Sequence, residues 1–412
     1  MVVANHQNAL LDPLVVFSAA GRPTRPLAKA PLFDQAMMGA LLRVLGGLPV
    51  YRRQDDPAES HRNAETFRAA IDALHAGDAL QIYPEGRSHS SPSIEPLRTG
   101  AARIALAAEA ERHGRLGLMI VPIGLTWERK HRFRGRVLAE IGEPFGVLPW
   151  LSPEGADDVE NVRSLTEEIA RRLRGCTVEL GSHADLELLS AADRIYSREK
   201  SLHGFREQDL LADRVPRLRR FASGLEWLRA RAPERYEVLA GEVYRIDRVS
   251  RALGAHTGVI PPRYPIRAVL RYATIEGLAL LVGVPLALVG SLVWYPAWIA
   301  PRFVVARVGP DHESVATYKL ATSFCTVPCT VLAAGLGAYL IRGGVTALAA
   351  MVAVPILGFA ALHWRERWGR VSEDVVIFLR VLARPRLRTR LATARAELTH
   401  EFEDVLWEME AE

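Results

Sequence analysis

Cysteine is scarce in this sequence: the 412 residues include only Cys176, Cys325 and Cys329. Cys325 and Cys329 stand inside an apolar segment, and the sequence has no Cys-x-x-Cys pair and no group of histidines with zinc spacing. A disulfide-held secreted domain or a structural zinc site needs more closely grouped ligands. We therefore expect no disulfide framework and no bound metal.

Three other patterns are missing. The start, MVVANHQNALLDP, lacks the basic stretch, apolar core and cleavage site of a secretory leader, so we expect a catalytic part that faces the cytoplasm. The sequence has no Walker-type phosphate loop, which argues against a nucleotide site. It also has no Gly-x-Ser-x-Gly elbow, which argues against a serine hydrolase that uses Ser88 beside His89.

Charge is present in both signs but is unevenly distributed. The net charge is +5 and the sequence pI is about 9.2, which suits an anionic partner. Three segments, 278–300, 320–341 and 343–362, contain no Asp, Glu, Lys or Arg, and each is long enough to cross a bilayer, which takes about 20 apolar residues. We expect an integral membrane protein, in the inner or plasma membrane if bacterial, and a phosphorylated substrate rather than nucleic acid.

The membrane topology follows from the charges that flank these segments. Basic residues precede the first segment and follow the third, and cytoplasmic flanks are usually positive. Three full crossings would put these flanks on opposite sides. Since Pro285 and Pro296 interrupt the first segment, we interpret it as re-entrant.

The first 150 residues alternate between short apolar runs and helical patterns, which predicts an α/β domain with a mostly parallel sheet flanked by helices. A helical extension is expected over 151–262, a membrane region with transmembrane helices over 263–365, and a charged helical tail over 366–412. The predicted strands are Val2–Asn5, Leu48–Tyr51, Ala79–Tyr83, Leu118–Thr126 and Val137–Gly142, and the predicted helices are Pro31–Leu45, Pro57–Ala76, Thr99–Arg112, Asp158–Arg174 and His183–Glu199.

His6 and Asp12 form the first candidate site, just after the first predicted strand. An alcohol that attacks an acyl group needs a base to take its proton, and a neutral histidine suits this role. A carboxylate on the other ring nitrogen fixes the tautomer and stabilises the imidazolium. The alternative is a helix cap at His6 and a surface charge at Asp12.

Three more segments carry candidate residues. Tyr83–His89 follows a strand and contains Glu85, which can bond a polyol hydroxyl, Gly86, which permits a sharp turn, and Arg87, which can meet a phosphate. Arg52 and Arg53 follow another strand and can hold a phosphate. Pro122 lies inside a strand, which suggests an edge, a bulge or a pocket wall. Taken singly, the first two segments are better explained as an ordinary loop and a solvated strand end, and Pro122 alone indicates almost nothing.

Together the motifs resemble the phospholipid/glycerol acyltransferase family: His-x₅-Asp, Gly…Arg, Pro-Glu-Gly and Val-Pro-x-Gly follow one another over about 120 residues. The wide His–Asp spacing and Tyr-Pro-Glu-Gly-x-Ser-His are similar to the branch of glycerol-3-phosphate/dihydroxyacetone-phosphate acyltransferases. Most members have four residues between His and Asp, whereas this sequence has five. Residues six positions apart on a helix point about 240° away from one another, so His6 must sit in a loop before the helix if it is to meet Asp12.

The resemblance implies a role for each residue. His6 is the general base and Asp12 orients it. Arg52, with Arg53 beside it, binds the acceptor phosphate, and Pro122 lines the acyl-donor side. Glu85 and Gly86 seat the glycerol backbone with Ser88 nearby, while the role of Arg87 stays open because much of the family has a small residue there.

The implied reaction transfers a fatty acyl group from acyl-CoA or acyl carrier protein to a hydroxyl of glycerol 3-phosphate or dihydroxyacetone phosphate in phospholipid biosynthesis. The acyl donor is a co-substrate, and no cofactor is implied. Lysophosphatidate or another lysophospholipid is the main alternative acceptor. An inactive lipid-binding membrane protein is the alternative of another class, which the intact His6, Asp12 and Glu85 disfavour.

Overall fold

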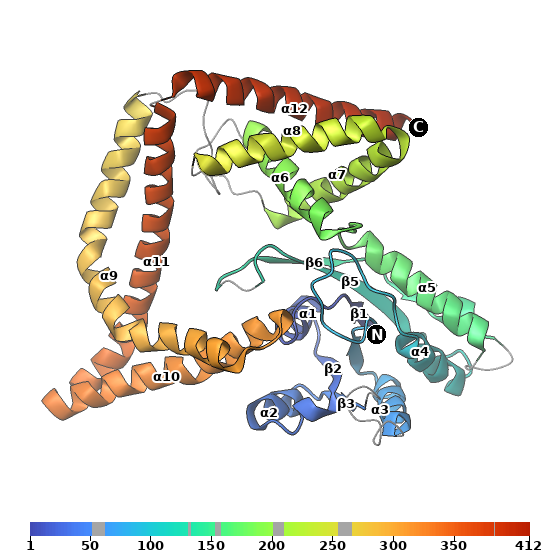
Figure 1. Cartoon of the computed structure of the whole chain (residues 1–412). Coiled ribbons are helices and arrows are strands. Elements are labelled where there is room, and N and C mark those ends of the chain that lie inside the picture. Colours follow the sequence, from blue (N-terminus) through green and yellow to red (C-terminus); the bar gives the residue numbers. More distant parts are fainter. Residues whose placement is uncertain (52–61, 131–132, 153–157, 201–209, 254–265, 383) are drawn as a thin grey trace. The chain divides into compact units, whose positions relative to one another are not determined.

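The computed structural model describes the chain except for residues 52–61, 131–132, 153–157, 201–209, 254–265 and 383 (Figure 1). The chain divides into two compact units. The sheet lies in the first, and the described part of the second is helical. The first unit comprises Met1–His183, Leu211–Arg219 and Asp311–Thr317, and the second comprises Ala184–Leu210, Arg220–Pro310 and Tyr318–Glu412.

The first unit is built on a seven-stranded sheet with the order β3-β2-β4-β1-β5-β6, and β7 pairs with β5. Strands β1 to β5 pair in parallel, whereas β6 and β7 run antiparallel to β5. The predicted α/β class with a mostly parallel sheet is confirmed. The strands are β1 (Val2–Ala4), β2 (Thr24–Lys29), β3 (Leu48–Val50), β4 (Ala79–Ile82), β5 (Met119–Trp127), β6 (Val137–Ile141) and β7 (Phe145–Gly146).

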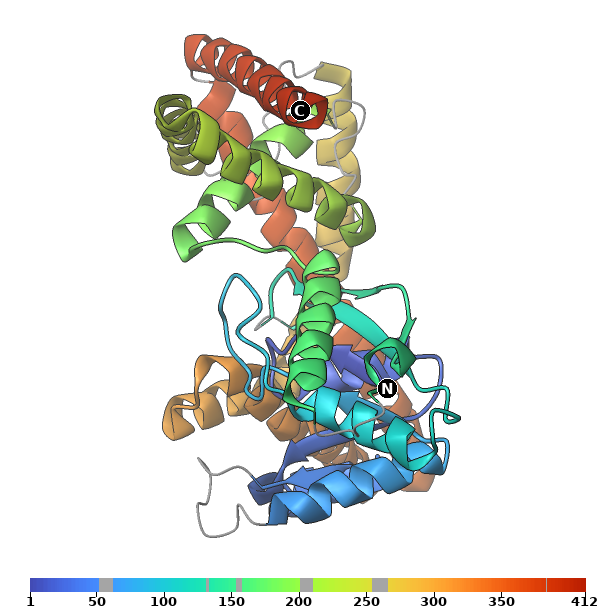
Figure 2. The same cartoon turned by 90° about the vertical axis from the view of Figure 1, so that its right-hand side faces the viewer.

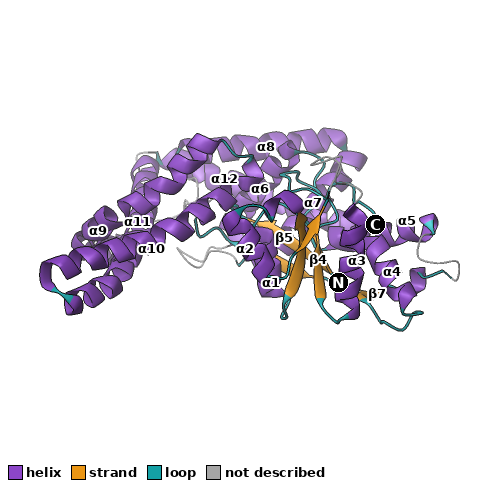
Figure 3. Ribbon diagram, turned by 90° about the horizontal axis from the view of Figure 1, so that it is seen from below, coloured by secondary structure: helices purple, strands orange, loops and turns teal. Residues whose placement is uncertain are grey.

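Helices cover both faces of this sheet (Figure 3). Successive side chains of β1 point to opposite faces. Val3 packs in the core that includes residues of α3, α4 and α5, whereas Val2 and Ala4 pack with Val16 of α1. Burial on both faces explains why the strands are short apolar runs. The helices are α1 (Leu11–Ala19), α2 (Ala36–Val44), α3 (Asn63–His75), α4 (Gly100–Glu111) and α5 (Val159–Gly175).

Each of the five predicted strands is present, but β2 and β7 were not predicted. Strand β2 is not an apolar run, because Arg25 lies within it and bonds Gly46 O and Asp78 Oδ2, both at 2.7 Å. The helix predicted from Pro31 begins at Ala36 instead, after a 3₁₀ turn over Ala30–Leu32. The start of the helix predicted over Pro57–Ala76 lies outside the described residues.

The boundary of the first unit also differs from the prediction. The expected extension begins at 151, yet α5 belongs to the sheet unit, since Leu165, Ile169 and Leu173 are buried in its core. The helices that follow are α6 (His183–Lys200), α7 (Leu211–Arg231) and α8 (Pro233–Ala252).

Helix α12 (Pro385–Ala411) packs along α8 within the second unit, and Figures 1 and 2 show it in red beside the yellow-green helices. Arg235 bonds Glu401 and Glu408 on α12 at 2.7 and 2.8 Å. The predicted charged tail is therefore a helix joined to the extension, and it begins later than residue 366.

In the part of the chain that the structure describes, three helices are long and apolar enough to cross a membrane, as expected. They are Val269–Val308 within α9 (Ile266–Val308), His312–Arg342, which includes α10 (Val315–Arg342), and Gly344–Arg380 within α11 (Gly344–Leu382). Large apolar side chains on them are exposed; Leu292 is 79% and Leu340 is 75% accessible. A continuous apolar surface of this kind suits a lipid environment rather than water.

The expectation that the first apolar segment is re-entrant is wrong, because α9 runs unbroken through Pro285, Pro296 and Pro301. It lies along α11, where Trp294 Nε1 donates to Val354 O at 2.9 Å and Trp364 Nε1 donates to Leu280 O at 2.8 Å. This packing supports the helix that the prolines weaken.

Candidate active site

The candidate site lies where three neighbouring parallel strands end. Strand β1 lies between β4 and β5, so their carboxyl ends meet at one edge of the sheet. His6 follows β1, Tyr83 and Glu85 follow β4, and Trp127 ends β5. Ligand and catalytic sites of open α/β sheets occur at this edge.

The predicted His6–Asp12 pair is formed. His6 Nδ1 lies 3.0 Å from Asp12 Oδ2, and the two side chains are 15% and 0% exposed. His6 sits in the loop before α1 and Asp12 in its first turn, as the wide spacing required. Since the carboxylate accepts the Nδ1 proton, Nε2 is left as the nitrogen that can take a proton.

Asp12 is held by three donors. Besides His6, the amide of Asn8 donates to Oδ2 at 2.6 Å, and Trp127 Nε1 donates to Oδ1 at 2.8 Å. Hydrogen bonds to both oxygens fix the orientation of the buried carboxylate. The sequence analysis did not find Trp127, because its approach to Asp12 depends on the pairing of β1 with β5.

Tyr83 forms one wall of the histidine site. Its ring stacks on the His6 imidazole with a centroid separation of 4.2 Å and an interplanar angle of 24°. Burial, and then the charge of Asp12, raise the pKa of Tyr83 well above its ordinary value. The neutral ring therefore fixes the plane of the imidazole without adding a charge beside it.

Glu85 organises the loop that follows β4. Its side chain is 0% exposed; Oε1 accepts the His6 amide at 2.8 Å, and Oε2 accepts the Glu95 amide at 2.9 Å and also meets His89 Nε2. His89 donates through Nε2, because its Nδ1 accepts the Ser91 amide at 3.1 Å. A direct contact between Glu85 and an acceptor hydroxyl would require one of these bonds to open.

Gly86 has a backbone conformation that suits only glycine. Its φ is +75°, and a Cβ built on it would lie 2.5 Å from Arg98 Nε and 2.7 Å from Arg98 Cδ. The turn after β4 therefore depends on the absence of a side chain.

We expect Gly86→Ala to destabilise the first unit by about 1–3 kcal/mol, since it adds both backbone strain and a clash. The measurement is the midpoint of thermal unfolding of the purified protein in detergent. Gly100→Ala is the matched control, because a Cβ there meets nothing within 4 Å. An unchanged midpoint for Gly86→Ala would contradict the strain argument.

The other predicted site residues are less closely grouped. Arg87 is 61% exposed and makes a bidentate pair with Glu95 at 2.8 and 2.7 Å, which raises the pKa of the guanidinium. Ser88 is half-buried in the same loop. Arg52 and Arg53 lie outside the described residues.

Pro122 is buried on β5 opposite Val3 of β1, so it is not on an edge strand. Its carbonyl accepts the Gly142 amide at 2.8 Å. An N–H at this position would point to the same side of β5 as the carbonyl. On that side β6 pairs with β5 from Ile123 onward and β7 pairs with Met119 and Ile120, so Pro122 lies in the gap between the two pairings. The interruption of the sheet edge therefore accommodates this proline.

Lys130 is a second residue that the sequence analysis missed. Its Nζ donates to Gln7 O at 3.0 Å and to Ser90 Oγ at 2.7 Å. Burial lowers its pKa, while the charges of Glu313 and Asp12 act in the opposite direction. A cation is thus held within the loops of the site.

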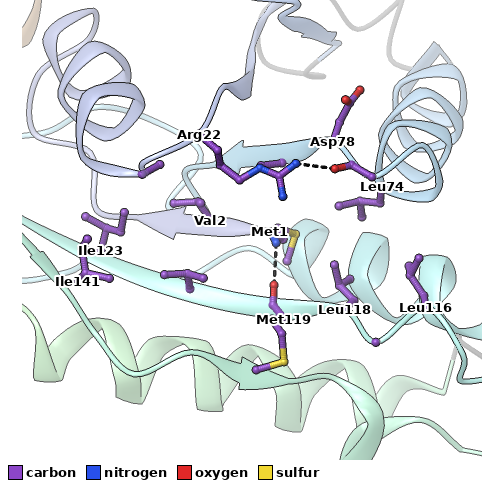
Figure 4. A pocket seen from close by; sticks show the side chains of 15 residues that line it. Met1, Val2, Arg22, Leu74, Asp78, Leu116, Leu118, Met119, Ile123 and Ile141 are labelled. Atoms are coloured by element: carbon purple, nitrogen blue, oxygen red, sulfur yellow. Dashed lines mark hydrogen bonds between the residues drawn. The ribbon is translucent and has the colours of Figure 1, made fainter.

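A cavity of about 410 Å³ lies at the opposite edge of the sheet (Figure 4). Its lining includes Val2, Ala79 and Met119, which belong to the amino ends of β1, β4 and β5. Arg22 at its rim donates to Gly77 O at 2.7 Å. The cavity is therefore separate from the edge that carries His6.

Residues 1–126 match the Acyltransferase family model. The first unit of this chain thus contains a domain of the acyltransferase family, as the motifs indicated. The family match and the His6–Asp12 geometry agree on the class of the domain.

Two yeast proteins are similar to the same part of the chain. Glycerol-3-phosphate O-acyltransferase 2 of Saccharomyces cerevisiae is 34% identical over 149 residues, which cover 35% of this chain and 19% of the relative. Glycerol-3-phosphate O-acyltransferase 1 of the same yeast is 28% identical over 140 residues, 33% of this chain and 18% of the relative. The chain thus spans about a fifth of the length of these relatives.

A solved structure with some likeness is the 1-acyl-sn-glycerophosphate acyltransferase PlsC from Thermotoga maritima. It is 22% identical, with a TM-score of 0.30, and the match covers 42% of this chain and 64% of that chain.

Proposed function

We propose that this protein is a membrane-bound enzyme that transfers a fatty acyl group from acyl-CoA or acyl carrier protein to a hydroxyl of a glycerol-phosphate acceptor. The observation that carries the proposal is the His6 Nδ1–Asp12 Oδ2 contact of 3.0 Å at the carboxyl edge of an acyltransferase-family domain. A neutral imidazole held by a buried carboxylate is the base that such a transfer requires.

In the proposed mechanism, His6 Nε2 removes the proton of the acceptor hydroxyl as its oxygen attacks the thioester carbonyl. The imidazolium that forms is stabilised by Asp12. When the tetrahedral intermediate collapses, the C–S bond breaks and the leaving thiolate takes the proton from His6. The products are the acyl ester and the free thiol, and the thioester supplies the driving energy, so no metal or nucleotide takes part.

Glycerol 3-phosphate, or dihydroxyacetone phosphate in its place, is the acceptor that we favour. The names of the two yeast relatives support the first of these, because both are glycerol-3-phosphate O-acyltransferases. Arg52 and Arg53 are proposed to bind the phosphate, and Pro122 to lie on the donor side. Lysophosphatidate remains the alternative acceptor, and no observation singles out an inactive lipid-binding protein.

We propose that the apolar helices α9, α10 and α11 hold the enzyme in the membrane with its active site facing the cytoplasm. Lysophosphatidate, phosphatidate and long acyl chains stay in the bilayer, so a membrane location keeps products and donor chains near the site. The exposed apolar side chains of these helices support the proposal.

The test is a parallel acceptor assay. Membranes that carry the protein receive radiolabelled acyl-CoA with glycerol 3-phosphate, dihydroxyacetone phosphate or lysophosphatidate, and the labelled lipids are separated. We expect His6-dependent product from glycerol 3-phosphate or dihydroxyacetone phosphate. Acyl carrier protein loaded with the same acyl group serves as the second donor.

Membranes that carry His6→Ala give the background for each acceptor. Product from lysophosphatidate alone would move the enzyme to the second acylation step. If neither donor gave His6-dependent product with any of the three acceptors, the proposed reaction would be rejected.

A further inference from the structure

The connection between the apolar helices α9 and α10 contacts the loop Gln7–Ala9, which lies between His6 and α1 and is called the catalytic loop below. Residues Asp311–Thr317 belong to the first unit, although the helices on either side belong to the second. Within this connection, Glu313 O accepts the amide of Ala9 at 3.3 Å. A backbone segment some 300 residues away in sequence thus lies against the loop between His6 and Asp12.

The Glu313 side chain enters a chain of polar contacts with the same loop. Ser90 Oγ lies 2.5 Å from Glu313 Oε1, to which it donates, and Ser90 Oγ in turn accepts from Lys130 Nζ at 2.7 Å. Lys130 Nζ also donates to Gln7 O at 3.0 Å. Lys130 therefore holds Gln7 directly, and the Ser90 hydroxyl joins Glu313 to Lys130.

The loop needs this external support because it is not helical. Helix α1 begins only at Leu11, so the geometry of the His6–Asp12 pair depends on the path of residues 7–9. Each of the three has a bond to a distant segment or to Asp12 itself. Gln7 O is bound by Lys130 Nζ, Asn8 Nδ2 donates to Lys130 O at 3.3 Å, Asn8 N donates to Asp12 Oδ2 at 2.6 Å, and Ala9 N donates to Glu313 O.

We propose that Glu313 and Lys130 are positioning residues for the acyl transfer, and that they act through the loop Gln7–Ala9 on the alignment of His6 with Asp12. The inference rests on the proposed function, because it concerns the same catalytic pair. Neither side chain contacts the imidazole in the described structure.

The charges explain why both residues are needed. Lys130 is half-buried, and a buried cation without a counter-charge is costly. The Glu313 carboxylate offsets this cost through Ser90, so its loss weakens the grip of Lys130 on Gln7. A shift of about 1 Å in a catalytic group can lower a rate about 100-fold.

The kinetic test uses Glu313→Gln, Lys130→Met and the double variant in native membranes. We expect each single variant to lower kcat about 10- to 100-fold with donor and acceptor KM changed little, because alignment rather than binding is lost. The double variant should be no worse than the poorer single variant, since both act through one loop. The control is Glu410→Gln, which breaks an exposed pair with Arg220 in the second unit.

A second measurement reads the juxtaposition without using activity. Ala9→Cys and Glu313→Cys are combined in a chain whose three native cysteines are replaced by alanine, and a short bismaleimide is added to membranes. We expect a cross-link, seen as a shift in electrophoretic mobility, and we expect it also in a His6→Ala background.

The outcomes separate the two proposals. Normal kcat in both single variants, or no cross-link, would overturn the positioning role while His6-dependent activity still stood. A cross-link in a chain whose wild-type form shows no acyl transfer would instead reject the proposed function on which the positioning role rests. If both variants had a lowered Tm but a normal kcat at temperatures well below that Tm, their role would be merely structural, and the inference would also be overturned.

Discussion

Replacing His6 with alanine is expected to lower kcat/KM for acyl transfer by about 10²–10⁴-fold, the usual contribution of a general base. The alcohol would then have to attack with its proton still attached or lose it to water. Binding of donor and acceptor should change little, because the imidazole removes the hydroxyl proton during the reaction and has no proposed role in binding. The measurement is the initial rate with radiolabelled acyl-CoA over a range of acceptor concentrations, so that kcat and KM are separated.

The control for this variant is His400→Ala. His400 lies on α12, is 77% exposed and pairs with Asp404 at 3.2 Å, so its loss should leave the rate unchanged. His6 is 15% exposed, and its ring stacks on Tyr83, so the thermal midpoint of His6→Ala must also be compared with that of wild type. Full activity of a folded His6→Ala protein would exclude the general-base mechanism.

The contact between His6 and Asp12 was predicted from the sequence because the requirement for that contact was local. Asp12 is the sixth residue after His6, and a helix would have turned the two side chains apart, so a loop at His6 was the one geometry in which they could meet. The same reasoning could not reach Trp127 or Glu313. Their contacts with the catalytic loop depend on strand order and on the return of the chain between α9 and α10, which no local pattern encodes.

The fold shows the same division between local and distant information. Apolar strands such as Ala79–Ile82 were predictable because both their faces are covered. Strand β2 was missed because Arg25 is satisfied by Gly46 O and Asp78, partners that only the folded sheet brings near. Helix α9 was misjudged because proline propensity was weighed without the support of α11, against which Trp294 and Trp364 bond.

Glu85 illustrates how a motif can be found correctly while its geometry suggests another use. The resemblance implied contact with the glycerol backbone, whereas the buried carboxylate bonds the His6 and Glu95 amides and His89. It holds the end of β4 to the end of β1. Three residues thus contribute to the position of His6: Glu85 from the loop after β4, Lys130 from the loop after β5, and Glu313 from the α9–α10 connection.

Asp12→Asn is expected to lower kcat about 10²–10⁴-fold with little change in fold, through the tautomer of His6. All three partners of the Asp12 carboxylate are donors: the Asn8 amide, Trp127 Nε1 and, in the wild-type pair, His6 Nδ1. An amide has one oxygen. If that oxygen accepts from Trp127, the NH₂ group faces the Asn8 amide N–H and donates to His6 Nδ1. The imidazole proton then lies on Nε2, so Nε2 can no longer accept a proton from the alcohol.

The opposite orientation of the amide keeps the correct tautomer but sets two donors, the NH₂ group and Trp127 Nε1, against each other in a buried site. Trp127→Phe removes one of these donors, so Asp12→Asn/Trp127→Phe should recover part of the rate that Asp12→Asn loses. Trp127→Phe alone should cost less than Asp12→Asn, because Asp12 Oδ2 still accepts from His6. Asp72→Asn, at an exposed pair with Arg68, is the matched control. A rate for Asp12→Asn equal to that of Asp72→Asn would mean that Asp12 has no role in orienting the base.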